Sequence, residues 1–154
     1  MHIHIIAIGA LKRGPERELV DDYMDRFQKT GRQIGLRSLT EHELPSANSR
    51  DDEALRILAR VPHGAVIAAL DERGKAQSSQ DWGDWVGDLR DRGTADLAFL
   101  IGGAEGHGAA VRSAADRLIA FGPQTWPHKL VRVMLTEQIY RSATLLAGTP
   151  YHKA

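Results

Sequence analysis

The sequence predicts an α/β fold with a mostly parallel sheet flanked by helices. Five strand-like segments alternate with segments in which apolar residues recur at helical spacing. Two of the strand-like segments, residues 65–70 and 97–101, are continuous apolar runs, which are typical of strands buried on both faces of a sheet. The 154 residues contain no repeat, linker or low-complexity tract, so we expect a single domain over residues 1–154.

The first three elements lie near the N-terminus. Residues 2–8 alternate in character and are rich in isoleucine, which predicts a strand closed by Gly9. Pro15 is placed as at a helix start, and apolar residues recur at helical spacing up to Gly31. A weaker strand is expected near residues 34–41.

Two more helices flank the first apolar strand. Ser49 is expected to cap one of them. One face of that helix is apolar: Ala54, Leu55, Leu58 and Ala59. The other helix follows Ser79 and ends near Gly93. It carries four large apolar residues: Trp82, Trp85, Val86 and Leu89.

The C-terminal third predicts a short helix over residues 109–117 and a fifth strand over 118–121. The longest helix is expected over residues 130–146, where Gly148 stops it. Ligands of parallel α/β sheets bind outside the carboxyl ends of the strands. The first candidate segments for a site are therefore the loops after Leu70, Ile101 and Phe121.

Charge and composition exclude several classes of protein. Twenty basic residues balance twenty acidic ones, so there is no bulk attraction to nucleic acid, and any positive charge used for RNA must be locally clustered. The absence of cysteine excludes disulfides, thiolate metal sites and a cysteine nucleophile. The N-terminal apolar stretch ends at Lys12 and Arg13 and is too short to cross a membrane. We expect a cytoplasmic protein with no membrane partner.

Residues 100–108, LIGGAEGHG, carry the densest signal. An apolar strand opens into a glycine-rich loop, in which the backbone can approach a ligand closely. The stretch matches neither the dinucleotide fingerprint nor a P-loop. A ligand site and a simple tight turn remain equally open on spacing.

The segment from Thr125 onward, TWPHKLVRV, is the second cluster. His128 lies at the N-terminus of the last helix, where free N–H groups favour an anion; the alternative is a helix-entry residue without chemistry. Trp126 can stack on a base, but a core position is the safer interpretation. His2 and His4 share a strand face, yet no third ligand is near, so we predict no metal site.

Taken together, the motifs resemble those of one family. LIGGAEG at 100–106, TWPHKLVRVMLTEQIYR at 125–141 and PYHK at 150–153 are similar to RlmH-type enzymes of the SPOUT superfamily. The opening IHIIAIGALK and LDERGK at 70–75 also fit that family, so the resemblance spans nearly the whole chain.

The resemblance implies a function and an architecture. It implies transfer of a methyl group from S-adenosylmethionine to N3 of a pseudouridine in 23S ribosomal RNA on the assembled ribosome. It also implies a homodimer whose C-terminal segment forms a trefoil knot. The implied cofactor-binding residues are Leu70, Gly102, Gly103, Phe121, Gly122, Pro123, Gln124, Thr125 and Trp126. The implied catalytic residues are His128, Arg132, Glu137, Arg141 and His152, and the implied RNA-binding residues are Tyr151, His152 and Lys153.

Three other functions remain as alternatives. A methyltransferase of the same superfamily can act on another RNA, such as tRNA. A ribosome-binding factor can keep the fold without turnover, although the intact glycine loop argues against it. A nicotinamide-dependent oxidoreductase is disfavoured because the dinucleotide fingerprint is missing.

Overall fold

In the computed structural model, which describes residues 1–153 apart from the side chains of His152 and Lys153, five strands form one sheet in the order β2-β1-β4-β3-β5. All four strand pairings are parallel, as predicted. The strands are β1 (His2–Ile8), β2 (Ser38–Leu44), β3 (Val66–Ala76), β4 (Asp96–Ile101) and β5 (Arg117–Ala120). The helices are α1 (Pro15–Gly31), α2 (Arg50–Arg60), α3 (Ser79–Asp91), α4 (Ala109–Ala114) and α5 (His128–Ala147), with short 3-10 helices at Arg32–Ile34 and Pro150–Lys153.

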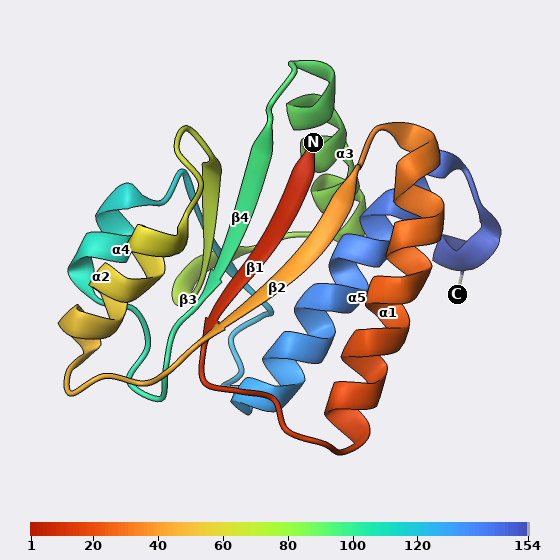
Figure 1. Cartoon of the computed structure of the whole chain (residues 1–154). Helices are drawn as coiled ribbons and strands as arrows, with labels where there is room; N and C mark the ends of the chain where they lie inside the picture. Colours follow the sequence, from red (N-terminus) through yellow and green to blue (C-terminus); the bar gives the residue numbers. More distant parts are fainter. Residues whose placement is uncertain (154) are drawn as a thin grey trace.

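The helices form two layers, one on each face of the sheet (Figure 1). Helices α1, α3 and α5 pack together on one face, and α2 and α4 pack together on the other. Side chains alternate between the two faces along a strand, so β1 directs Ile3 and Ile5 toward the first layer and Ile6 and Ile8 toward the second. Strand β4 is buried on both faces, which explains its continuous apolar sequence.

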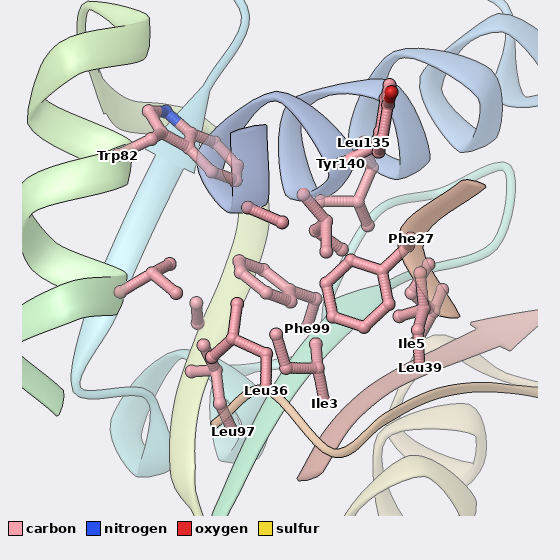
Figure 2. Packing of buried hydrophobic residues seen from close by; sticks show 14 of the residues in the cluster. Ile3, Ile5, Phe27, Leu36, Leu39, Trp82, Leu97, Phe99, Leu135 and Tyr140 are labelled. Atoms are coloured by element: carbon pink, nitrogen blue, oxygen red, sulfur yellow. The ribbon is translucent and has the colours of Figure 1, made fainter. Parts of the chain in front are cut away.

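The larger core lies under α1, α3 and α5, and Figure 2 shows its side chains converging from these helices and the central strands. Trp82 of α3 stacks on Phe99 of β4 with ring centroids 5.6 Å apart. The same indole stacks on Phe121, just after β5, at 5.9 Å. The core therefore fixes the start of the segment that leaves β5.

The second strand begins later than the sequence pattern predicts. Residues 32–34 form a 3-10 turn, and Gly35 adopts a left-handed φ of 80° that ends it. The chain then enters β2 at Ser38 and continues to Leu44. The predicted boundaries, 34–41, were therefore wrong at both ends.

The buried face of α2 also differs from the prediction. Leu55 is 63% exposed, whereas Ala54 and Ile57 are buried. Glu53 turns inward because its carboxylate accepts a hydrogen bond from the Ala47 N–H at 3.2 Å. A satisfied acidic side chain thus replaces an apolar one on the inner face.

The predicted cap of α2 is confirmed, and α3 begins one residue earlier than predicted, because it includes Ser79. Ser49 caps α2 by accepting from the Asp52 N–H at 3.1 Å. Ser78, rather than Ser79, caps α3, and it forms a reciprocal capping box with Asp81. Helix α4 ends at Ala114, three residues earlier than expected.

Strand β3 is longer than the apolar run that predicts it and contains a bulge. Its first part pairs with β5 through Leu70, opposite Ile119, and its second part pairs through Lys75, again opposite Ile119. Residues 71–74 therefore pass around Ile119. A β-carbon on Gly74 would lie within 2.7 Å of three backbone atoms of Ile119, so this approach requires glycine. None of the described helices is long and apolar enough to cross a membrane.

Candidate active site

A pocket of about 240 Å³ lies at the carboxyl ends of β4 and β5 and beside residues 70–72, where the first part of β3 ends. The loops after Leu70, Ile101 and Phe121, which the sheet rule selected, all contribute to it. Its walls are formed by Leu70, Asp71, Glu72, Ile101, Gly102, Ala104, Ile119, Ala120, Phe121, Gly122, Pro123, Gln124, Thr125, Trp126, His128 and Val131.

The structure brings together all but one of the residues predicted to bind the cofactor. Leu70, Gly102 and the whole segment 121–126 line the pocket. Gly103 does not, because it lies against Glu53 of α2, whose carboxylate would meet an added β-carbon at 2.5 Å. Gly103 instead shapes the turn, since its carbonyl accepts from the Gly106 N–H at 3.0 Å.

The glycine-rich loop forms a tight turn, and Gly102 and Ala104 in it also line the pocket. A β-carbon on Gly102 would lie 2.8 Å from the carbonyl carbon of Gly106, which leaves no room for a side chain. His107 folds beneath the loop and is 3% exposed, and its Nε2 lies 3.2 Å from the Leu100 carbonyl oxygen. Burial lowers the pKa of His107, which disfavours the charged imidazolium beneath the loop.

The segment after β5 closes back on itself over the pocket. The indole N–H of Trp126 donates to the Phe121 carbonyl at 3.0 Å. Trp126 remains 38% exposed, so the expectation of a core position was wrong. The hydrogen bond explains why a tryptophan is held at the surface: it joins the two ends of a pocket-lining segment.

His128 is the first residue of α5 and lies at the pocket wall. It is exposed, and Pro127 before it provides no side-chain cap. The first N–H groups of α5 therefore lack a side-chain acceptor beside the pocket, where the helix dipole favours negative charge. Of the predicted catalytic residues with described side chains, His128 is the one that lines the pocket.

Two acidic residues of the pocket were not singled out from the sequence. Asp71 and Glu72 follow the apolar part of β3 and line the pocket beside Leu70. The Asp71 side chain is 6% exposed and lies 3.8 Å from the Arg112 guanidinium. It also accepts from the Arg73 N–H at 2.9 Å. Asp71 and Glu72 come directly after an apolar run that was predicted to end at the ligand-binding edge, and this position could have identified them from the sequence.

Arg132 lies one turn beyond His128 but points away from the pocket. It is 5% exposed, and its guanidinium donates to Glu41 and Glu43 of β2, each at 3.0 Å. It also donates to the Gly9 carbonyl at 3.1 Å. Arg17 of α1 completes the network with a 2.7 Å contact to Glu41. Burial alone would raise the pKa of Glu41, but the hydrogen bonds and charges of the two arginines outweigh it and lower the pKa.

Glu137 and Arg141 form a separate cluster farther along α5. Their carboxylate and guanidinium are 2.6 Å apart, and the Tyr151 hydroxyl donates to the same Glu137 oxygen at 2.9 Å. The Arg141 guanidinium lies 5.0 Å from the centroid of the Tyr151 ring. Nine residues separate His128 from Glu137, about 14 Å along a helix. Within one chain, the structure does not bring these predicted catalytic residues to the pocket.

Tyr151 belongs to that cluster and packs on Tyr140, with ring centroids 4.7 Å apart. Burial and its hydrogen bonds to Tyr23 and Glu137 raise the pKa of its hydroxyl. Tyr151 is therefore held against α5, and its predicted RNA contact stays a prediction. The predicted roles of His152 and Lys153 rest on side chains that lie outside the described residues.

The fold and the pocket define an α/β protein with a candidate ligand site at the carboxyl edge of a parallel sheet. Comparison with known families identifies the family. A family model described as "Predicted SPOUT methyltransferase" matches residues 1–152. The chain belongs to the SPOUT methyltransferase family.

The relatives within that family carry a more particular name. The chain is 51% identical over 154 residues to "Ribosomal RNA large subunit methyltransferase H" of Hyphomonas neptunium, with the whole of both chains covered. It is 49% identical over 159 aligned positions to the protein of that name from Nitrobacter hamburgensis, with 99% of each chain covered.

Solved structures show more distant likeness. The SpoU methyltransferase AviRb from Streptomyces viridochromogenes, crystallised with its cofactor AdoMet, matches with 14% identity and a TM-score of 0.42. The match covers 90% of this chain and 56% of that protein, a distance at which it bears on neither site nor substrate.

Proposed function

We propose that this protein methylates 23S ribosomal RNA, at N3 of a pseudouridine, with S-adenosylmethionine as donor, on the assembled ribosome in the cytoplasm. One observation carries the proposal. Three of the five segments that carry the family resemblance in the sequence, those beginning at Leu70, Leu100 and Thr125, contribute residues to a single pocket, with His128 on its wall. The full-length identity with relatives named for methylation of large-subunit ribosomal RNA supports the class of substrate.

The chemistry of the pocket fits S-adenosylmethionine. Bound there, this compound supplies a methyl group on a positively charged sulfur, which leaves as a neutral thioether when the methyl is transferred. The lining side chains include the carboxylates of Asp71 and Glu72 and, His128 aside, no basic group. Leu70, Ile101 and Val131 give the walls apolar surface. A cationic ligand with apolar parts suits both features.

We assign His128 the task of removing the proton from N3. The nitrogen must lose that proton to form the new N–CH₃ bond with its electron pair, and a neutral imidazole at the pocket wall can accept it. His152 stays the alternative base. A catalytic role for Arg132, which the family resemblance implies, conflicts with its contacts to Glu41 and Glu43, and stabilisation of negative charge on the uracil carbonyls needs a free guanidinium. We propose that Arg132 holds α5 against β2. Arg141 remains the candidate for stabilising negative charge on the uracil carbonyls.

A homodimer would resolve the distance between His128 and the Glu137–Arg141 cluster. The outer side of α5 carries Leu130, which is 40% exposed, and half-buried Val133 and Met134. Leu19 of α1, 45% exposed, lines a groove together with Val133 and Met134. A second copy covering this apolar surface would bring the partner's C-terminal segment toward the pocket. Two protomers would then form one site.

The pairing around Ile119 supports the knot that the family resemblance implies. Leu70 and Lys75 both pair with Ile119, so the bulge of β3 passes around β5. We propose that the chain beyond β5 is threaded through this loop. The same threading would order residues 71–74 and 121–126, the two strips of chain that form opposite walls of the pocket.

The test is transfer of labelled methyl from S-adenosylmethionine to ribosomes, free large subunits and tRNA, all from cells lacking the protein. We expect label in the large-subunit RNA of assembled ribosomes. Label in tRNA would show that the substrate is tRNA and not ribosomal RNA. If no sample is labelled but the protein associates with ribosomes, the result would indicate a ribosome-binding factor and not an enzyme.

The assignment of the base is tested separately. Single-turnover methylation by His128→Ala and His152→Ala should show a slowed chemical step in at least one variant, with cofactor affinity retained. If neither variant is slowed, neither histidine is the base.

A further inference from the structure

The loop between β1 and α1, residues 9–14, carries two exposed cations, Lys12 and Arg13, on a backbone that is held from several sides. The Gly9 N–H donates to the Leu44 carbonyl at 2.7 Å. The Leu11 N–H donates to the Glu43 carboxylate, and the Leu11 side chain is 6% exposed. Leu11 is the buried residue that anchors the loop, and the next two residues, Lys12 and Arg13, are exposed to solvent.

The buried ionic network beside the loop is electrically balanced, whereas the loop itself carries an unbalanced positive charge. Arg17 and Arg132 balance Glu41 and Glu43 within the buried network. Among the described residues, no carboxylate lies within 4.0 Å of the charged groups of Lys12 or Arg13. In a chain of zero formal net charge, two free cations on one anchored loop are a distinct local feature.

The loop follows the carboxyl end of β1 (Figure 1), and the pocket is lined by Ile101, at the carboxyl end of the neighbouring strand β4. Ala7, near the end of β1, pairs with Ile101 of β4, which lines the pocket. Arg132 links the two regions directly: it follows pocket-lining Val131 on α5 and donates to the Gly9 carbonyl at 3.1 Å. Exposed Lys129, on the first turn of α5, adds a third cation at this edge.

We propose that the loop of residues 9–14 is a phosphate-binding element that holds the backbone of the substrate RNA beside the pocket, through Lys12 and Arg13. The inference rests on the proposed function and adds the element that docks the RNA. A lysine and an arginine on a fixed loop suit phosphodiester oxygens, which bind cations without regard to base. The buried network gives the loop a fixed position relative to α5, so phosphate binding would set the distance between the RNA and His128.

The experiment compares two double variants of the full-length protein. Lys12→Ala/Arg13→Ala removes the proposed contacts. Lys29→Ala/Arg37→Ala is the matched control, because these residues are also one exposed lysine and one exposed arginine without a described carboxylate within 4.0 Å. They lie at the last turn of α1 and just before β2, toward the opposite edge of the sheet.

For the loop variant we expect a KM for ribosomes about tenfold higher, with kcat at saturating ribosomes and S-adenosylmethionine affinity unchanged. The slope of log affinity against log salt should become shallower by about one for each lost phosphate contact. The control should leave both quantities as in the native protein. Restoring charge with Lys12→Arg/Arg13→Lys should recover most of the affinity.

The inference is overturned if the loop variant keeps its KM and salt slope, or if the control changes as much. Failure of the proposed function has a different signature, namely no methylation by the native protein. In that case, sedimentation with ribosomes across the same salt series still compares the loop variant with its control.

Discussion

Gly74 packs directly against the backbone of Ile119. An added β-carbon would lie within 2.7 Å of the nitrogen, α-carbon and carbonyl carbon of Ile119. Gly74 belongs to the bulge of β3, and Ile119 is both a member of β5 and part of the pocket wall. The contact therefore joins the bulge of β3 to the shape of the candidate cofactor site.

Gly74→Ala should both destabilise the protein and abolish cofactor binding. The atoms it meets belong to backbone and cannot rotate away, so the cost should reach about 3 kcal/mol, the upper part of the usual range for overpacking. Thermal unfolding and titration with S-adenosylmethionine measure the two effects. Gly64→Ala is the control: it has open space around it and a φ of 76°, so only conformational strain of about 1 kcal/mol should appear. A Gly74→Ala protein that binds the cofactor normally would contradict this account.

Arg132→Met should lower the free energy of unfolding by about 3–5 kcal/mol, because it leaves the Glu41 and Glu43 carboxylates without their buried partner. Chemical denaturation gives the value. Arg26→Met is the matched control, since Arg26 and Asp22 form an ion pair whose side chains are both half exposed. There we expect little or no loss of stability, because both charges are screened by solvent. Equal losses in the two variants would show that the buried network is not a main support of α5.

Acid should weaken the fold through Glu41. Its pKa is lower in the folded protein than the ordinary glutamate value of about 4.3. The unfolded chain therefore binds the proton first, so the stabilisation is complete above about pH 5 and is lost as pH falls through the folded pKa. In a series of denaturation curves from pH 7 to pH 3, Glu41→Gln should show a shallower fall than the native protein. If the free energy of unfolding falls equally steeply with pH in both proteins, Glu41 does not contribute to the acid sensitivity.

Asp71→Asn should reduce affinity for S-adenosylmethionine about tenfold, close to 1.4 kcal/mol, by removing a buried negative charge from the pocket. Affinity for S-adenosylhomocysteine, whose sulfur is uncharged, should fall less. Asparagine keeps an oxygen that can accept from the Arg73 N–H, so the bulge should stay intact. Glu105→Gln, an exposed change on the neighbouring glycine loop, is the control. Equal losses for both ligands would mean that Asp71 does not act on the sulfonium charge.

The sequence predicted the fold class and most of the pocket because both follow from local rules. Continuous apolar runs identified β3 and β4, and the carboxyl-end rule then selected the three loops that meet there. Family resemblance named the individual cofactor residues in one of these loops, 121–126, which has no periodic signal of its own. Ser49 was identifiable as a cap because its side chain acts on a neighbour three residues away.

Interactions between distant segments were beyond such rules. Leu55 was expected inside because the pattern could not reveal that Glu53 finds a donor in Ala47. Arg132 was given a catalytic role because nothing near it in sequence predicts its partners, Glu41 and Glu43. The exposed position of Trp126 depends likewise on a hydrogen bond to the Phe121 carbonyl.

The most direct test of the central claim is nucleoside mass spectrometry of large-subunit RNA after incubation of ribosomes from cells lacking the protein with the purified protein and S-adenosylmethionine. The account predicts one new species, pseudouridine methylated at N3, which is absent without the cofactor and strongly reduced when Gly74→Ala replaces the native protein. A methyl group on a different nucleoside, or an RNA that remains unchanged while the protein binds the cofactor, would contradict it.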